Sequence, residues 1–272
     1  MSVDTAQAPI SEERKRYLKK LKKRRMAIRV TQAAILVLIF VLWEVAASLG
    51  LIDSFITSQP SRMLRTLQNL ANEGALFMHV SITIAETVVG FVAGTVLGTL
   101  IAVILWWSDF VSKVADPYLV TLNSLPKVAL GPILIVWIGA GPASIIVMAL
   151  LVSLVVTVIS MLNGFNGVSQ DKIKLLKTFG AAKLQVLTKV ILPASIPTMI
   201  SALKINVGMS WVGVIVGEFL VSKAGLGYLI VYGGQVFRLD LVMTSVVICA
   251  AAAALMYHGV SWLEKKYIKW SQ

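Results

Sequence analysis

The chain has 272 residues, of which 57% are hydrophobic and only 14% are charged, and Lys and Arg exceed Asp and Glu by 12. Soluble domains carry far more charge, and apolar runs long enough to cross a bilayer recur along this chain. The composition therefore excludes an ordinary soluble domain and predicts an all-α polytopic membrane protein. The single Cys249 lies in an apolar run, which excludes an intrachain disulfide and a cysteine-rich metal site.

Ten of the 25 basic residues cluster between Arg14 and Arg29, directly before the first apolar run. Met1–Pro9 is polar and has no helical pattern, so we expect it to be disordered. A basic cluster also begins signal peptides, but the apolar run here is long and lacks a clear small-residue cleavage pattern. We therefore expect a retained first span, with the cluster on anionic lipid. Nucleic acid is not an expected partner, because the next residues enter the bilayer.

Six apolar segments are long enough to be membrane spans. In the second, Gly90, Gly94 and Gly98 form a small-residue face, along which we expect another helix to approach closely. In the third, Pro126 and Gly131–Pro132 predict an interruption. The expected spans are 31–51, 80–107, 118–138, 143–162, 196–221 and 241–263, with a more polar segment at 52–77, a short loop at 108–117 and a glycine-rich connection at 222–240.

The basic residues predict the orientation of these spans. If the N-terminus lies inside, the inner segments hold ten, one, five and three basic residues, and the outer segments hold two, none and two. This distribution follows the positive-inside rule and predicts cytoplasmic N- and C-termini. The expected organisation is a basic cytoplasmic segment 1–30, a six-span domain 31–264 containing a cytoplasmic loop 163–193, and a cytoplasmic tail 265–272.

The loop Asn163–Pro193 differs from a plain connector between spans. It carries five lysines and one acid, and its apolar residues recur at helical spacing in two stripes. Gly180 lies between the stripes and can adopt the left-handed conformation that ends a helix. Pro193 is expected to end the second stripe and suits the first turn of the next helix. A hairpin packed under its own bundle and a docking surface both fit this pattern. The stripes are Ile173, Leu176 and Phe179, and then Leu184, Leu187 and Ile191.

This loop resembles the EAA loop of ABC-importer permease subunits, where a glycine is followed ten residues later by an aliphatic residue, any residue, Leu and Pro. Gly180 and Val190–Pro193 reproduce that half of the motif. The family's Glu-Ala-Ala is Lys-Leu-Leu here, so the acidic residue of the motif is absent. The resemblance assigns these residues to an ATPase-coupling loop: Lys174, Leu175, Leu176, Gly180, Ala181, Ala182, Val190, Leu192 and Pro193.

The resemblance extends from about Trp43 to Lys266, where the chain is similar to permeases of the nitrate, sulfonate and taurine importer group. The most similar blocks are SLPKVALGPILIVWIGAGPAS (Ser124–Ser144) and WVGVIVGEFLVSKAGLGYLI (Trp211–Ile230). The resemblance implies a bacterial cell-membrane homodimer with two separate ABC ATPase subunits and an extracytoplasmic substrate-binding protein. It also implies alternating access for a small solute, such as a sulfonate, nitrate, taurine or a vitamin precursor.

Charged residues inside spans are costly and mark function. Glu44 and Lys204 lie near span ends and are expected to reach the interface. Glu86 lies deeper and fits either a pair with a basic residue or a pathway role. Structural hydrogen bonding is the alternative to a transport role for the other polar residues in the spans. The translocation-path candidates are Lys127, beside the prolines of the third span, and Asn206, Ser210 and Glu218, which share roughly one face of the fifth.

No catalytic residue, metal ligand or cofactor site is expected. The chain has no G-x-x-x-x-G-K-[ST] phosphate loop, and its two histidines, His79 and His258, lie far apart. Two other classes remain as alternatives. An ion-coupled secondary transporter or channel often shows internal repeats, and the two three-span halves show no clear repeat. A membrane-embedded enzyme is disfavoured because no set of His, Cys or acidic residues is clustered.

Overall fold

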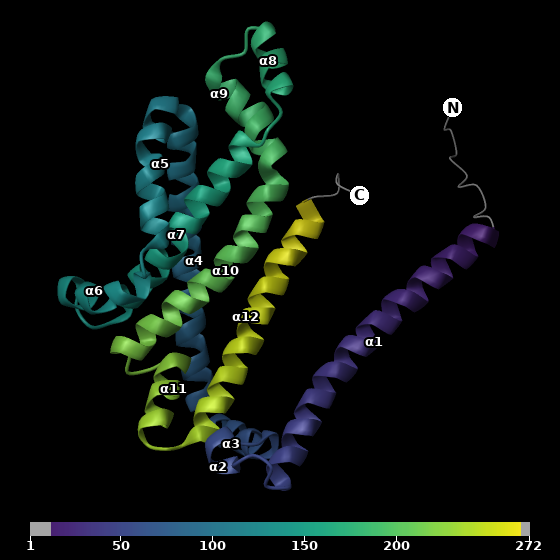
Figure 1. Ribbon diagram of the computed structural model, residues 1–272, viewed down its shortest axis with the longest axis vertical. Coiled ribbons are helices and arrows are strands. Elements are labelled where there is room, and N and C mark those ends of the chain that lie inside the picture. Colours follow the sequence, from purple (N-terminus) through teal and green to yellow (C-terminus); the bar gives the residue numbers. More distant parts are fainter. Residues whose placement is uncertain (1–11, 268–272) are drawn as a thin grey trace. The chain divides into compact units, whose positions relative to one another are not determined.

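The computed structural model describes residues 12–267, which divide into two compact units between Arg62 and Met63. The described residues contain no strand, which confirms the all-α fold class. Five helices are long and apolar enough to cross a membrane, and a bent helix pair gives a sixth span when it is counted as one (Figure 1). Met1–Pro9, which is expected to be disordered, and the end of the expected tail 265–272 lie outside the described residues.

The first unit consists mainly of α1 (Glu12–Ser48), which runs without a break from the basic cluster into the first apolar run. This helix begins earlier than the expected span because Lys and Arg are good helix formers. After α2 (Ser54–Thr57), α3 (Pro60–Asn72) begins. The Glu44 carboxylate accepts the N–H of Ser61 at 2.9 Å, which satisfies a backbone donor in the first turn of α3.

In the second unit, α4 (Ala75–Trp107) packs along α7 (Pro142–Asn166) through the glycine face identified in the sequence. A Cβ atom added at Gly90 would lie 2.7 Å from the Cβ of Ala149, and one at Gly98 would lie 2.7 Å from Thr157. These positions leave no room for a larger residue. The expected close approach of another helix is confirmed, and that helix is α7.

The helix α10 (Leu192–Val221) also packs on α7 through small residues. A Cβ atom added at Gly217 would lie 3.0 Å from the Cα of Ile145. Near the other end of this contact, the Ser195 hydroxyl donates to the carbonyl of Gly164 at 3.0 Å. The helix α7 is therefore packed against both α4 and α10, and these three helices form the centre of the unit.

The third span is interrupted as predicted, but it begins earlier than expected. The segment 108–117 is not a loop, because α5 (Asp109–Ser124) covers most of it and the Ser108 hydroxyl accepts a first-turn N–H at 3.3 Å. A serine cap followed by an acid is a helix start signal, which explains the difference. The chain then turns through a 3₁₀ segment, η1 (Lys127–Leu130), into α6 (Gly131–Ile138), and α5 and η1–α6 are bent by 85°.

The connection expected at 222–240 is also helical. It contains α11 (Leu226–Gln235), which precedes the last span, α12 (Leu239–Tyr267). Leu226 and Leu229 are buried together with Leu241 at the start of α12. The helix forms despite its glycines because burying one apolar face offsets their weak helix propensity.

Candidate functional site

The loop 163–193 folds as two helical segments joined at Gly180, as the two apolar stripes predicted. The first segment is α8 (Gln170–Thr178). After it, Gly180 has φ +77°, and its N–H donates to the carbonyl of Lys177 at 3.0 Å. The next N–H, of Ala181, donates to the carbonyl of Leu176 at 3.1 Å. The left-handed residue expected at Gly180 is confirmed, and it closes α8 in the manner typical of helix C-termini.

The second segment is continuous with the fifth span. The helix α9 (Lys183–Val186) passes into a π-helical stretch, η2 (Leu187–Ile191), and then directly into α10. Pro193 lies in the first turn of α10, as expected, but it does not end the second segment, because that segment and α10 are continuous. Proline has no N–H to donate to the preceding turn, and the helix widens into the π form just before it.

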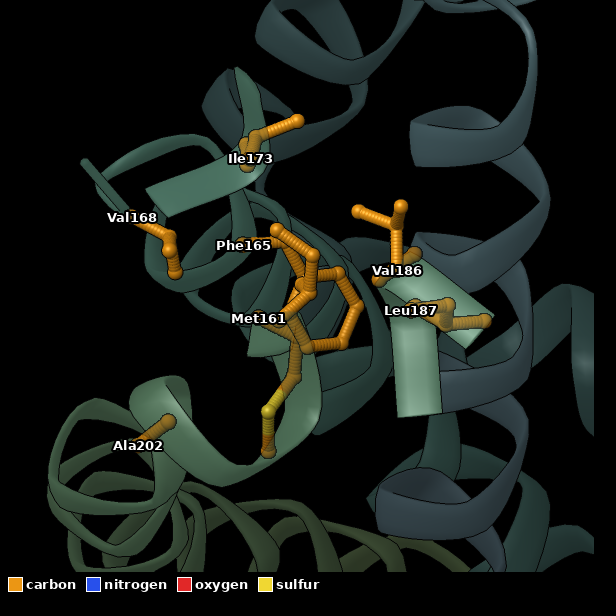
Figure 2. Close-up of a cluster of buried hydrophobic side chains, with 9 residues drawn as sticks. Met161, Phe165, Val168, Ile173, Val186, Leu187 and Ala202 are labelled. Atoms are coloured by element: carbon orange, nitrogen blue, oxygen red, sulfur yellow. The ribbon is translucent and has the colours of Figure 1, made fainter. Parts of the chain in front are cut away.

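The inner side of the loop shares one buried apolar cluster with the ends of three spans (Figure 2). In Figure 2, Ile173 of α8 and Val186 and Leu187 of the second segment lie around Phe165 of α7. Phe165 is fully buried. Because such clusters are close-packed, moving the loop requires moving the spans that contribute to it. The cluster consists of Ala102, Met161, Phe165, Val168, Ile173, Val186, Leu187, Ile191 and Ala202.

A lysine of the loop also binds the end of the second span. The ammonium of Lys183 donates to the carbonyl of Trp107, the last residue of α4, at 2.5 Å. The same ammonium lies 6.0 Å and 5.5 Å from the ring centroids of Trp106 and Trp107. A cation at a helix C-terminus and over aromatic rings is favourable on both counts. The loop is thus linked to α4 by a polar contact as well as by the cluster.

The outer side of the loop presents exposed apolar side chains. Leu175, Phe179 and Leu184 are 57%, 81% and 58% exposed, and we call these three residues the coupling face. The expected stripes are therefore divided: Ile173 and Leu187 are buried, whereas one residue of each stripe lies in the coupling face. Helical spacing alone therefore does not show which residues of a stripe are buried, because each helical segment buries only part of its stripe.

The translocation-path candidates fall into two groups. Lys127 is half-buried at the break of the third span, and its ammonium donates to the carbonyl of Asn123 near the end of α5 at 3.0 Å. The three candidates on α10 are buried, and Asn206 donates to the hydroxyl of Thr95 on α4 at 2.9 Å. Glu218 also accepts the hydroxyl of Thr83 on α4 at 2.6 Å, so two of these candidates contact α4, a neighbour that the sequence did not predict. Those three are Asn206, Ser210 and Glu218.

Sequence reasoning missed several partners of the intramembrane charges. The charged neighbour of Glu86 is the acidic Glu218, not a basic residue. Lys204 of α10 forms an ion pair with Glu264 of α12 at 2.5 Å. The spacing of His79, Thr83 and Glu86 places them on one face of α4. This spacing is the signal that could have drawn attention to a polar contact between α4 and another helix. Between residues 12 and 267, no three His, Cys, Asp or Glu residues are grouped so as to hold a metal ion.

Known sequences identify the family. The family model for the binding-protein-dependent transport system inner membrane component matches residues 94–268. A probable ABC transporter permease protein of Haemophilus influenzae is 31% identical over 247 residues, which cover 90% of this chain and 100% of that protein. The taurine transport system permease protein TauC of Escherichia coli is 25% identical, covering 86% of this chain and 87% of that protein.

Two solved structures share the fold. A bacterial ABC transporter involved in the import of the acidic polysaccharide alginate matches with a TM-score of 0.64 at 15% identity, over 93% of this chain and 100% of that chain. An inward-facing MetNI methionine ABC transporter matches with a TM-score of 0.63 at 19% identity, over 70% of this chain and 95% of that chain. The chain therefore belongs to the binding-protein-dependent transport system inner membrane components, the multi-pass permease subunits of ABC importers.

Proposed function

We propose that two copies of this chain form the translocation path of a bacterial ABC importer and engage two ATPase subunits and one extracytoplasmic binding protein. Family membership implies an ATPase and a binding protein. The observation that carries the proposal is the two-sided loop 163–193, which has an exposed apolar coupling face and a buried side shared with three spans. A loop that transmits movement from a partner into the membrane needs both sides.

The positive-inside distribution supports a cytoplasmic loop and cytoplasmic termini. In the second unit, α8 and α9 lie at the opposite end from α11 (Figure 1), so α11 then faces outward. The basic segment 1–30, the six-span domain 31–264 and the tail 265–272 keep the roles expected from the sequence. The binding protein would contact 52–77 and 222–240, where Phe237 is 71% exposed.

In this mechanism, closure of the ATPases on ATP shifts the coupling face. The buried cluster and Lys183 pass that shift to α4, α7 and α10, which rock between inward-open and outward-open arrangements. ATP hydrolysis belongs to the separate ATPase chain, because this sequence has no phosphate loop. The coupling role belongs to residues 174–176, 180–182, 190, 192 and 193. Gly180 contributes the turn, and the other residues form the helical segments on either side of it.

The proposed substrate is a small solute of the sulfonate, nitrate, taurine or vitamin-precursor kind. The name of TauC supports taurine, and a putative aliphatic sulfonates transport permease protein of Bacillus subtilis is 29% identical over 85% of this chain. Within the path, Lys127 at the span break offers an ammonium to an anionic solute. The buried Asn206, Ser210 and Glu218 shape the wall of the path from inside the subunit.

The coupling face also counts against the alternative of an ion-coupled secondary transporter or channel. A self-sufficient transporter has no partner that would cover three exposed apolar residues on a folded loop.

The test changes Gly180 to Val and measures co-purification of the partner ATPase that family membership implies. A residue with a side chain at φ +77° costs roughly 1–2 kcal/mol, so the two segments should rotate relative to each other. We expect normal membrane levels but loss of the ATPase and of substrate-stimulated ATP hydrolysis. Gly74→Val is the matched control, since Gly74 has φ +71° and, like Gly180, open space around an added Cβ. It should keep the ATPase. A Gly180→Val protein that binds the ATPase and transports normally would remove the main support for coupling.

A further inference from the structure

The N-terminus of α11 is capped by side chains of two other helices. The first N–H groups of a helix have no partner within it, and a buried helix start needs acceptors from elsewhere. Here three successive N–H groups find three different acceptors, two on α4 and one on α10, which we call the amide clamp. The bonds are Gly225 N–H to His79 Nδ1 (2.9 Å), Leu226 N–H to Thr83 Oγ1 (2.8 Å) and Gly227 N–H to Glu218 Oε2 (2.5 Å).

Two glycines at the start of α11, the N-cap Gly225 and Gly227, are required by the side chain of Glu218. Gly225 has φ +110°, a conformation that residues with side chains rarely adopt. A Cβ atom added at Gly227 would lie 2.7 Å from the Cβ of Glu218, and one at Gly225 would strike its carboxyl group. The sequence Gly-Leu-Gly therefore makes room for a buried acid directly beneath the start of α11.

The hydrogen bonds around Glu218 define its chemical form. Its Oε2 accepts the Gly227 N–H, and its Oε1 accepts the Thr83 hydroxyl at 2.6 Å. Its remaining side-chain neighbour is the carboxyl group of Glu86. Within residues 12–267, neither acid forms an ion pair with Lys or Arg, and the two acids are only 1% and 6% exposed.

A hydrogen bond between two carboxyl groups needs a proton on one of them. Glu218 accepts its other bonds, so the carboxylate form suits it. Glu86 has a buried oxygen, Oε2, that receives no hydrogen bond from the protein, and a carboxylate would require donors there. The neighbouring His79 accepts an N–H at Nδ1 and stacks on Tyr228, so it offers no proton from that nitrogen.

We propose that Glu86 holds a proton that it donates to the Glu218 carboxylate, and that this pair locks the start of α11 to α4 and α10. The proton replaces the basic partner that a buried acid otherwise needs. Glu86 is thus a positioning residue that acts through Glu218.

The Glu86–Glu218 pair links movement at the loop to movement at α11. This link rests on the proposed function. The helix α4 runs from the clamp to Trp107, which binds Lys183 of the loop. The helix α10 runs from the loop to Glu218. A shift of the loop therefore carries α11 along with both helices, and α11 precedes the exposed Phe237 that the binding protein would meet.

The test compares Glu86→Gln with Glu218→Gln in the purified full chain in lipid nanodiscs, by hydrogen–deuterium exchange of the peptide 222–232. Glutamine at 86 keeps a donor toward Glu218 and needs no proton, so exchange should stay within about twofold of wild type. Glutamine at 218 turns one acceptor into a donor that faces another donor. Exchange at 225–227 should then rise about tenfold or more, as expected for loss of a hydrogen bond to a charged group.

Two further variants and an infrared spectrum complete the test. If Glu218→Gln does not fold, Thr83→Val replaces it, since valine keeps the shape but removes the acceptor of the Leu226 N–H. Ser81→Ala is the matched control on α4, because Ser81 bonds only to the Met78 carbonyl of its own helix. The infrared spectrum of wild type minus Glu86→Gln should show the carbonyl band of a protonated acid.

The proposal would be overturned if hydrogen–deuterium exchange became equally faster in both glutamine variants, or faster in neither. It would also be overturned if the infrared difference spectrum showed only the loss of a carboxylate band. These readings use the chain without partners, so they stand apart from the ATPase test. A Gly180→Val protein that fails that test leaves the clamp result unchanged.

Discussion

The two ends of the second unit are held by different chemistry. At the loop end, nine apolar side chains form one buried cluster. At the α11 end, His79, Thr83 and Glu218 accept three successive backbone N–H groups. Apolar packing is non-directional, whereas hydrogen bonds weaken steeply when their angles change. The loop end is therefore suited to hold contact while segments shift, and the α11 end is suited to hold one helix at a fixed angle.

The largest effect is expected at the apolar end, from Phe165→Ala. Phe165 is fully buried in the cluster, and truncation of such a residue costs about 3–5 kcal/mol. Thermal unfolding of the purified chain should shift to lower temperature, and the ATPase should be lost with it. Phe179→Ser is the matched control, because Phe179 is 81% exposed and its loss should change stability by less than about 0.5 kcal/mol.

The control also sharpens the comparison of the loop's two sides. Phe179→Ser should keep the melting temperature but weaken ATPase co-purification. If the two phenylalanine variants lose stability equally, the loop has no separate inner and outer side.

A smaller effect is expected between the two ends, from Gly94→Leu. Gly94 faces Ser153 on α7, and an added side chain would force α4 and α7 apart at a cost of about 1–3 kcal/mol. Assembly yield and melting temperature should fall. Gly208→Leu is the control, since Gly208 lies in α10 with open space around an added Cβ. If Gly94→Leu is as stable as wild type, then no tight α4–α7 contact joins the loop end of the second unit to its α11 end.

The smallest effect is expected from Lys174→Glu, which restores the acid of the family motif. Lys174 is exposed, and a glutamate there lies three residues before Lys177 on α8, which favours the helix by a few tenths of a kcal/mol. Stability should stay within about 0.5 kcal/mol, and ATPase co-purification should persist when salt is raised. A loss of co-purification would mean that charge, not the apolar coupling face, determines the contact.

Local signals in the sequence predicted the features that depend on few neighbouring residues. The left-handed turn at Gly180, the glycine face of α4 and the break after Ser124 all follow from backbone geometry and side-chain size. The expected third span begins at 118 and so omits the first turns of α5, although their start signal, Ser108 followed by an acid, is also local. The charged residues of these turns are equally typical of a connection between spans.

The amino-acid order was enough for the fold class, the number of apolar spans and the family, because hydrocarbon admits only helices that satisfy their own backbone. Packing alone decided which half of each stripe in the loop is buried, and it turned a glycine-rich connection into α11. It also brought Glu86 and Glu218 together from positions 132 residues apart. No local pattern can report such a contact, since its energy comes from side chains that meet only after α4 and α10 have packed on α7.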